Sequence, residues 1–342
     1  MSHAEQSQPL KFSPRLVPKV WGGRDLAVRG EGDAAALIGE SWELSDIPNQ
    51  ESRCRTAEFE GLAPHELGAR LGFERMGMGR DRAARFPVLI KLLDIAGRLS
   101  VQVHPPHNAA QPGELPKDEV WSVLSAGADA RIYLGWRDGV TMEEIEQALG
   151  TRAMLSLMNE HSPTAGDQVI IPAGVFHAAT GPLQIAEIQA SSDTTYRVYD
   201  WDQVEETTGQ PRTLHLKEAR QSLERYDLRI RGAYCRADQL KQALNERPNN
   251  VVELGWFRAF DVYVIRDESV ATAWRVDQCR ILVRIPCAWR NNTNSSEHSS
   301  PGNAFENVEV VLLPAGTRWT PTCEQSDRAM LTLGVTVYPP NS

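Results

Sequence analysis

Hydrophobic and polar residues alternate in many short segments of this chain, which is the period-two pattern of half-buried β-strands. Short runs of turn residues separate these segments, and such spacing is typical of a β-barrel or β-sandwich. The clearest segments are residues 86–95, 98–105, 119–126, 129–136, 167–173, 182–189 and 194–201. A second β-rich region begins near residue 230. The pattern therefore predicts a mainly β protein.

Helical periodicity interrupts the strands in three places. One helix is predicted over 64–72 and another over 214–223. A third begins at Thr141, because Glu144 three residues later completes a capping box, and its pattern continues to about residue 160. We therefore expect a domain over 1–230, with helical insertions at about 60–80 and 141–160, and a second domain over 231–342.

Composition narrows the class of protein. The chain has 342 residues, long enough for about two domains. Its net charge of −9 disfavours nucleic acid or an anionic membrane as a partner, and we find no apolar run long enough to span a bilayer. The five cysteines lack a CxxC pair and the first residues lack a signal-peptide core, so we expect reduced thiols and a cytoplasmic protein.

The segment LSVQVHPPH, residues 99–107, separates two kinds of side chain. On a β-strand, alternate side chains point to opposite faces. Leu99, Val101 and Val103 suit a core, whereas Gln102 and His104 lie together on the other face. An amide and an imidazole placed side by side are candidate metal ligands.

A second motif, GDQVIIPAGVFHAA, predicts a strand, a tight turn at Pro172–Gly174 and a second strand that carries His177 inward. It resembles the second motif of the cupin superfamily of jelly-roll barrels. In that superfamily the first motif supplies an i, i+2 pair and a later Glu, which here are Gln102, His104 and Glu119. Two imidazoles, a carboxylate and an amide suit Zn²⁺, and less selectively Fe²⁺, Mn²⁺ or Co²⁺.

Several ordered blocks resemble the type I phosphomannose isomerase family, in its short bacterial form. They are VWGGRDL (20–26), IGESWELSD (38–46), PVLIKLLDIAGRLSVQVHP (87–105), KDEVW (117–121), IPAGVFHA (171–178) and EIQASSDTTYRVYDW (187–201). The resemblance implies a bound Zn²⁺ and interconversion of mannose 6-phosphate and fructose 6-phosphate. It also implies that Gln102, His104, Glu119 and His177 are the metal ligands.

The same resemblance assigns roles to further residues. Arg197 corresponds to the family's catalytic arginine, while Lys91, Lys117 and Asp193 match active-site positions. Lys91, Lys117 and Arg197 would give a sugar phosphate local positive charge. On its strand, Arg197 is expected to share a face with Thr195 and Tyr199.

Aldose–ketose isomerisation needs a base that moves a proton between adjacent carbons. Lys117 is one candidate, because a nearby metal dication disfavours its ammonium form. Glu187 is the other, because it shares a strand face with Leu183 and Ile185, where a carboxylate needs a partner. The sequence leaves both open.

The C-terminal region supports a duplicated barrel that has lost its site. VEVVLLPAGTRW repeats the turn motif, but Trp319 stands where a histidine ligand would be. The predicted fold is therefore two cupin-type jelly-roll barrels, the second degenerate. Two other functions are compatible with the ligand set: a non-catalytic sugar-phosphate-binding or regulatory cupin, and a metal-dependent oxygenase, for which Gln102 would be an unusual extra ligand.

Overall fold

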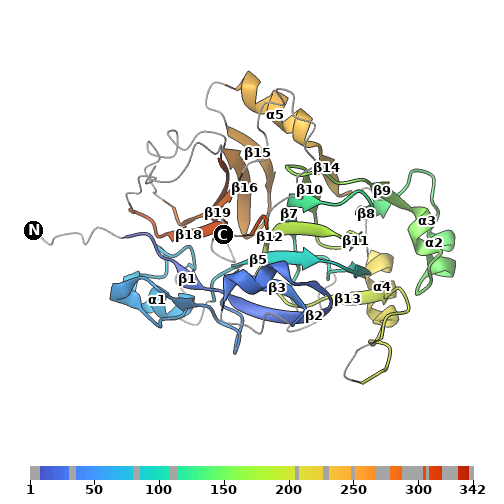
Figure 1. The fold of residues 1–342 in the computed structure, drawn as a ribbon, viewed down its shortest axis with the longest axis horizontal. Helices are drawn as coiled ribbons and strands as arrows, with labels where there is room; N and C mark the ends of the chain where they lie inside the picture. Colours follow the sequence, from blue (N-terminus) through green and yellow to red (C-terminus); the bar gives the residue numbers. More distant parts are fainter. Residues whose placement is uncertain are drawn as a thin grey trace, which may run out of the picture. The chain divides into compact units, whose positions relative to one another are not determined.

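The computed structural model (Figure 1) divides into two compact units. It describes residues 8–30, 36–79, 85–107, 115–204, 208–225, 231–247, 251–265, 278–286, 303–305, 308–317 and 330–338. We call residues 16–41 and 92–235 the central unit. Residues 1–15, 42–91 and 236–342 form the flanking unit. Each unit is discontinuous in sequence, and the expected domains 1–230 and 231–342 stay a prediction.

Two antiparallel sheets contain the strands of the central unit; parts of β2, β3 and β5 in the first sheet belong to the flanking unit. The first sheet has the order β14 (Ala233–Cys235), β10 (Gln168–Ile171), β7 (Glu119–Ala126), β12 (Leu183–Ala190), β5 (Val88–Ile95), β2 (Arg15–Gly23) and β3 (Ile38–Leu44). The second has the order β13 (Tyr196–Tyr199), β6 (Arg98–Val103), β11 (His177–Thr180), β8 (Arg131–Trp136) and β9 (Met158–His161). The mainly β class predicted from the alternation is confirmed.

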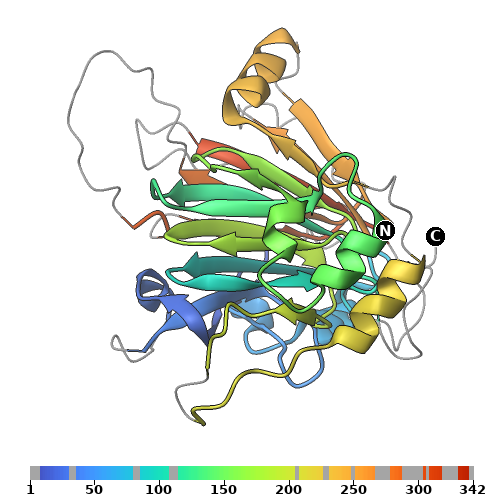
Figure 2. The same ribbon diagram turned by 90° about the vertical axis from the view of Figure 1, so that its right-hand side faces the viewer.

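Three helices lie together beside β8, β9 and β13: α2 (Met142–Ala148), α3 (Met154–Leu157) and α4 (Leu216–Arg225) (Figures 1 and 2). Their apolar side chains join the same buried core as Leu99, Val101 and Val103 of β6. The alternation on β6 therefore sends its aliphatic residues into this core and leaves the opposite face to polar groups.

The capping box at Thr141 is confirmed, because the Glu144 amide donates to Thr141 Oγ1 at 3.3 Å and the Thr141 amide donates to the Glu144 carboxylate at 2.8 Å. The expected continuous helix to residue 160 is wrong. α2 stops at Ala148, because Leu149 is extended and Gly150 adopts a φ of 82°. The chain then forms α3 and the edge strand β9.

Two glycines explain the close approach of β2 and β3 in the central unit. A Cβ atom on Gly22 would lie 2.5 Å from the backbone nitrogen of Gly39. A larger residue at position 22 would force the two strands apart, because backbone cannot move aside as a flexible side chain can.

The flanking unit contains a five-stranded antiparallel sheet. Its order is β15 (Val251–Trp256), β16 (Phe260–Ile265), β19 (Met330–Val337), β17 (Arg280–Pro286) and β18 (Glu309–Leu313). The other elements of this unit are β1 (Phe12–Ser13), β4 (Arg53–Cys54), α1 (Pro64–Leu71), α5 (Ala237–Glu246) and the 3₁₀-helix η2 (Ala57–Phe59); η1 (Asp25–Arg29) belongs to the central unit. Trp319 lies outside the described residues, so the degenerate second barrel stays a prediction.

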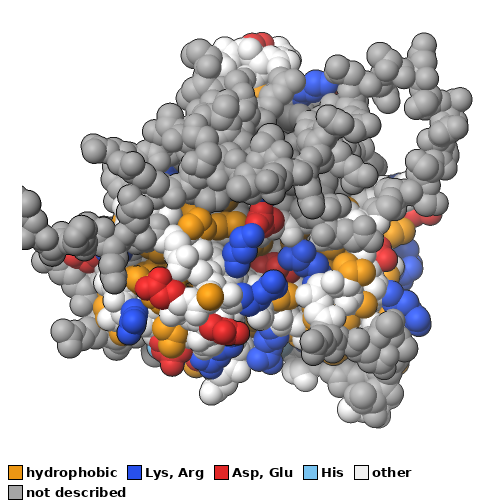
Figure 3. Space-filling view, turned by 60° about the vertical axis from the view of Figure 1, so that its left-hand side comes forward, with side chains coloured by type: hydrophobic (Ala, Val, Ile, Leu, Met, Phe, Trp, Pro, Cys, Tyr) orange, Lys and Arg blue, Asp and Glu red, His pale blue; other side chains and the backbone are white. Residues whose placement is uncertain are grey.

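Acidic and basic side chains lie interspersed on the face shown in Figure 3. Within the described part of the chain, no helix combines the length and the apolar character needed to cross a bilayer.

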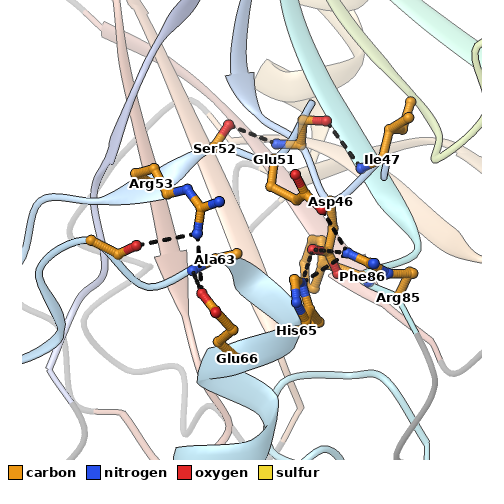
Figure 4. A network of polar contacts seen from close by, with 12 residues as sticks. Asp46, Ile47, Glu51, Ser52, Arg53, Ala63, His65, Glu66, Arg85 and Phe86 are labelled. Carbon is orange, nitrogen blue, oxygen red and sulfur yellow. Dashed lines mark hydrogen bonds and ion pairs between the residues drawn. The ribbon is translucent and has the colours of Figure 1, made fainter. Parts of the chain in front are cut away.

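A buried carboxylate, Asp46, holds three segments of the flanking unit together (Figure 4). Its Oδ2 accepts the Phe86 amide at 2.7 Å, and its Oδ1 lies 2.7 Å from His65 Nδ1. Arg85 approaches the same carboxylate at 3.5 Å and Glu51 at 3.0 Å. Burial raises the pKa of Asp46, and the hydrogen bonds and positive neighbours oppose that rise. The network joins the end of β3, the first turn of α1 and the segment that enters β5.

We expect Asp46→Ala to lower the free energy of unfolding by about 1–3 kcal/mol, because the buried Phe86 amide loses its acceptor. Arg53→Ala is the matched control: its ion pair with Glu66 is about half exposed and should contribute less than about 1 kcal/mol. Urea unfolding of both variants measures the difference. Equal losses would contradict a structural role for the buried carboxylate.

Candidate metal centre

Three buried side chains of the central unit meet where its two sheets come together. Glu119 begins β7 of the seven-stranded sheet, His177 begins β11 of the five-stranded sheet, and His104 directly follows β6. One ligand atom from each of the three lies within 4.8 Å of the others. Among the described residues this is the one such group of His, Cys, Asp and Glu side chains.

The hydrogen bonds of both imidazoles fix which nitrogen faces the group. His104 Nδ1 lies 3.1 Å from the Thr194 carbonyl, and His177 Nδ1 lies 3.0 Å from the Val175 carbonyl. A carbonyl can only accept, so each Nδ1 carries the proton and each Nε2 presents a lone pair. These Nε2 atoms lie 3.2 Å and 3.4 Å from the two oxygens of Glu119.

This donor set fits a divalent cation. His104 Nε2 and Glu119 Oε2 are buried without a hydrogen-bond partner among the described atoms, a costly arrangement unless something else binds them. Burial, with the charge of Lys117, lowers the pKa of His104 to about 4, so this imidazole is neutral and able to coordinate. The ring edge of Trp121 packs against His177 and helps to fix its orientation.

Gln102 joins the group from β6. Its amide Nε2 lies 3.0 Å from His177 Nε2, and Gln102 is the register partner of His177 across β6 and β11. A half-turn of the amide would present its oxygen to the same point, so Gln102 can supply a fourth ligand atom. The four residues proposed as ligands therefore lie together.

Lys117 lies within the same buried cluster. Its ammonium is 2.6 Å from Glu119 Oε1 and offsets the cost of burying that carboxylate. The charge of Lys117 and the two histidines hold the pKa of Glu119 well below its usual range, against the effect of burial. The carboxylate is therefore ionised, as a ligand must be.

Asp118, which directly precedes β7, contacts two other segments of the chain. Its Oδ1 accepts the Ala173 amide at 2.8 Å, and its Oδ2 lies 2.9 Å from His107 Nε2. It thereby links the loop after His104 to the Pro172–Gly174 turn that precedes His177. His107 was not among the expected ligands, and the structure pairs it with Asp118.

The registers place Glu187 and Arg197 on the faces that carry Glu119 and Gln102, two of the candidate ligands. Glu187 pairs with Trp121 across β12 and β7, two residues from the pair of Gln189 with Glu119, so these side chains share one face. Arg197 pairs with Gln102 across β13 and β6. Opposed residues project to the same face, so Arg197 lies on the ligand side of the sheet.

The expected alternation on β13 is wrong beyond Arg197. The register shifts between Arg197 and Tyr199, and Tyr199 pairs with Val101 on the core side of β6. A bulge of this kind turns the following side chain to the other face. Tyr199 therefore does not share a face with Arg197.

Two other expected residues have different surroundings. Lys91 belongs to the flanking unit, where its buried ammonium lies 5.1 Å from the ring centre of Trp42. Asp193 is exposed in the loop between β12 and β13. The sequence did not reveal the Thr194 and Val175 carbonyls that orient the imidazoles, because any residue type supplies a carbonyl.

Comparisons with known proteins agree with this arrangement. Residues 10–122 match the family profile described as phosphomannose isomerase type I, catalytic domain. The mannose-6-phosphate isomerase of Streptococcus mutans is 35% identical over 216 residues, which cover 62% of this chain and 67% of that protein. The mannose-6-phosphate isomerase ManA of Bacillus subtilis is 33% identical over 221 residues, 64% of this chain and 69% of that protein.

Solved structures show the same fold. The crystal structure of the mannose 6-phosphate isomerase from Bacillus subtilis aligns with a TM-score of 0.65 at 22% identity, over 96% of this chain and 99% of that one. A mannose 6-phosphate isomerase bound with zinc and yttrium aligns with a TM-score of 0.55 at 13% identity, over 97% of this chain and all of the other. Because the curated relatives share a third of their residues with this chain over two thirds of their length, the chain belongs to the type I phosphomannose isomerase family.

Proposed function

We infer that this protein is a zinc-dependent mannose-6-phosphate isomerase that interconverts mannose 6-phosphate and fructose 6-phosphate. The observation that carries the inference is the buried group of His104, Glu119 and His177, in a chain of this family, with both Nε2 lone pairs directed at one carboxylate. A cytoplasmic location is part of the proposal, and the described cysteines, Cys54, Cys235 and Cys279, are free thiols.

In this proposal Gln102, His104, Glu119 and His177 hold one Zn²⁺. A bound dication would stabilise negative charge that develops on the substrate oxygens. The Thr194 and Val175 carbonyls hold the two imidazoles in the tautomer that coordinates, and Lys117 keeps the buried carboxylate ionised.

The reaction transfers one proton between adjacent carbons. A base removes the proton from C2 of the open-chain aldose, which leaves an enediolate with its negative charge on O1. The proton on O2 moves to O1, and the base returns its proton to C1 to give the ketose. The Lys117 ammonium is engaged with Glu119 at 2.6 Å, and an ammonium has no acceptor site. This favours the buried carboxylate of Glu187 as the base.

Arg197 supplies fixed positive charge on the ligand side of the sheet, because a guanidinium stays protonated at any working pH. We assign it to the enediolate. Lys91 is assigned to the substrate phosphate and Asp193 to catalysis, on the family resemblance alone.

A coupled assay with and without chelator tests the function. Mannose 6-phosphate should be converted to fructose 6-phosphate by the zinc-loaded protein, and this activity should be lost on chelation and restored by Zn²⁺. Retention of zinc without turnover would instead support a non-catalytic sugar-phosphate-binding protein, and activity that required oxygen would support an oxygenase.

We expect His177→Ala to lose both zinc and isomerase activity while the fold survives, because the strands hold the sheets together and His177 faces the metal group. Elemental analysis should find one zinc per unmodified chain and less than about a tenth of that in the variant, since a lost ligand weakens metal binding strongly. His161→Ala, on the edge strand β9, should keep its zinc. Full activity of His177→Ala in metal-free buffer would refute the site.

Replacement of Arg197 separates chemistry from substrate binding. If the guanidinium engages charge that develops in the transition state, Arg197→Ala should lower kcat roughly 100-fold with little change in KM. Arg197→Lys should recover little activity, because an ammonium lacks the planar fork of donors. Steady-state kinetics at full zinc occupancy measure both; a raised KM at unchanged kcat would move Arg197 to phosphate binding.

A further inference from the structure

The segment Thr213–His215, between β13 and α4, contacts Arg197 at three atoms. The Arg197 amide donates to His215 Nδ1 at 3.0 Å, and the His215 amide donates to the Arg197 carbonyl at 2.7 Å. The Arg197 guanidinium donates through Nη1 to the Thr213 carbonyl at 2.9 Å. Main chain and side chain of Arg197 are therefore held by two residues of one segment, Thr213 and His215.

The position of Arg197 in the sheet explains why these contacts matter. β13 is an edge strand, with β6 on one side and no strand beyond it in the described sheet. An edge strand has outward-facing amide and carbonyl groups that need other partners. At Arg197 both partners come from His215, one from its ring and one from its backbone.

We propose that His215 is a positioning residue, which holds Arg197 on the ligand side of the sheet by accepting its amide hydrogen at an unprotonated Nδ1. This proposal rests on the proposed function, because it needs Arg197 to act in the reaction. His215 itself is not assigned a contact with substrate or metal.

The hydrogen bond from the Arg197 amide to His215 Nδ1 requires one protonation state of the His215 ring. A neutral imidazole protonated at Nε2 can accept at Nδ1, whereas a doubly protonated ring faces the Arg197 amide with a second donor. Three groups face the ring: the Arg197 guanidinium, the Glu218 carboxylate and the Tyr196 ring at 6.3 Å. Burial and then the charge of Arg197 lower the pKa of His215 below its usual value of 6.5, and Glu218 opposes this.

A pH dependence follows from this arrangement. At neutral pH His215 is uncharged, and its Nδ1 accepts the hydrogen bond from the Arg197 amide. As the pH falls through the depressed pKa of His215, the ring gains a proton and the bond to the Arg197 amide is lost. The kcat of the zinc-loaded enzyme should then fall, because catalytic groups displaced by a fraction of an ångström lose much of their effect.

A purely structural role makes a different prediction. The His215 carbonyl accepts the Ala219 amide at 2.9 Å, so His215 is also the residue that precedes the first turn of α4. If this were its whole role, replacement would lower the unfolding midpoint and leave the kcat of the folded enzyme, and its pH profile, unchanged.

Two substitutions separate these roles. In His215→Asn, the amide oxygen stands at the same bond separation as Nδ1 and accepts a hydrogen bond without titrating, and Asn is also favoured before a helix. His215→Leu keeps similar bulk and removes the acceptor. His161→Asn, at the opposite edge of the same sheet, is the control histidine.

The kinetic measurements use zinc-loaded full-length enzyme across pH 5–9, with zinc content and circular dichroism recorded at each pH. His215→Leu should lower kcat about 10- to 100-fold at all pH values, with KM and zinc content unchanged. His215→Asn should match the wild type above neutral pH and should lack its loss of kcat in acid. His161→Asn should keep the wild-type profile.

Some results would overturn the proposal. A wild-type kcat in His215→Leu, or the wild-type loss in acid persisting in His215→Asn, would show that His215 does not position Arg197. An inactive wild-type protein at full zinc occupancy would instead refute the proposed function. Loss of activity in Arg197→Ala together with unchanged His215 variants would refute the positioning role alone.

Discussion

The buried carboxylate of Glu119 is the constraint on which the central unit is organised. Removing an ion from water costs several kcal/mol unless close partners compensate. Here the compensation comes from Lys117 at 2.6 Å and from two imidazoles at 3.2 Å and 3.4 Å, which are carried by three separate segments. Those segments must therefore meet at one point. They are brought there by the pairing of the strands, the turn before His177 and the loop after His104.

Much of the fold could be predicted from the sequence, because strands buried on one face must alternate. The segments predicted as strands in the central unit correspond to β5, β6, β7, β8, β10, β12 and β13. β2 was missed because Pro18 and the Gly22–Gly23 pair interrupt its pattern. β9 was taken for helix because its four residues, Met158–His161, are too few to show a period of two.

The part of the candidate site that could be predicted consists of side chains that stand at a fixed spacing in the sequence. Gln102 and His104 are two residues apart, and His177 follows a recognisable turn, so spacing and turn chemistry are enough to group these residues. The contacts of Arg197 could not be predicted in this way. They depend on backbone groups of Thr213 and His215, which carry no mark in the sequence, and on the His215 ring, which is 18 residues away from Arg197 along the chain.

The triplet Lys117–Asp118–Glu119 leads into β7, and its side chains make contacts in two different places. The outer two enter the metal group, and the middle one anchors the turn that leads to His177. Insertion or deletion of a single residue here would shift Lys117 and Asp118 relative to Glu119 and disturb all three contacts at once. Over evolution, the length of this triplet should therefore not change.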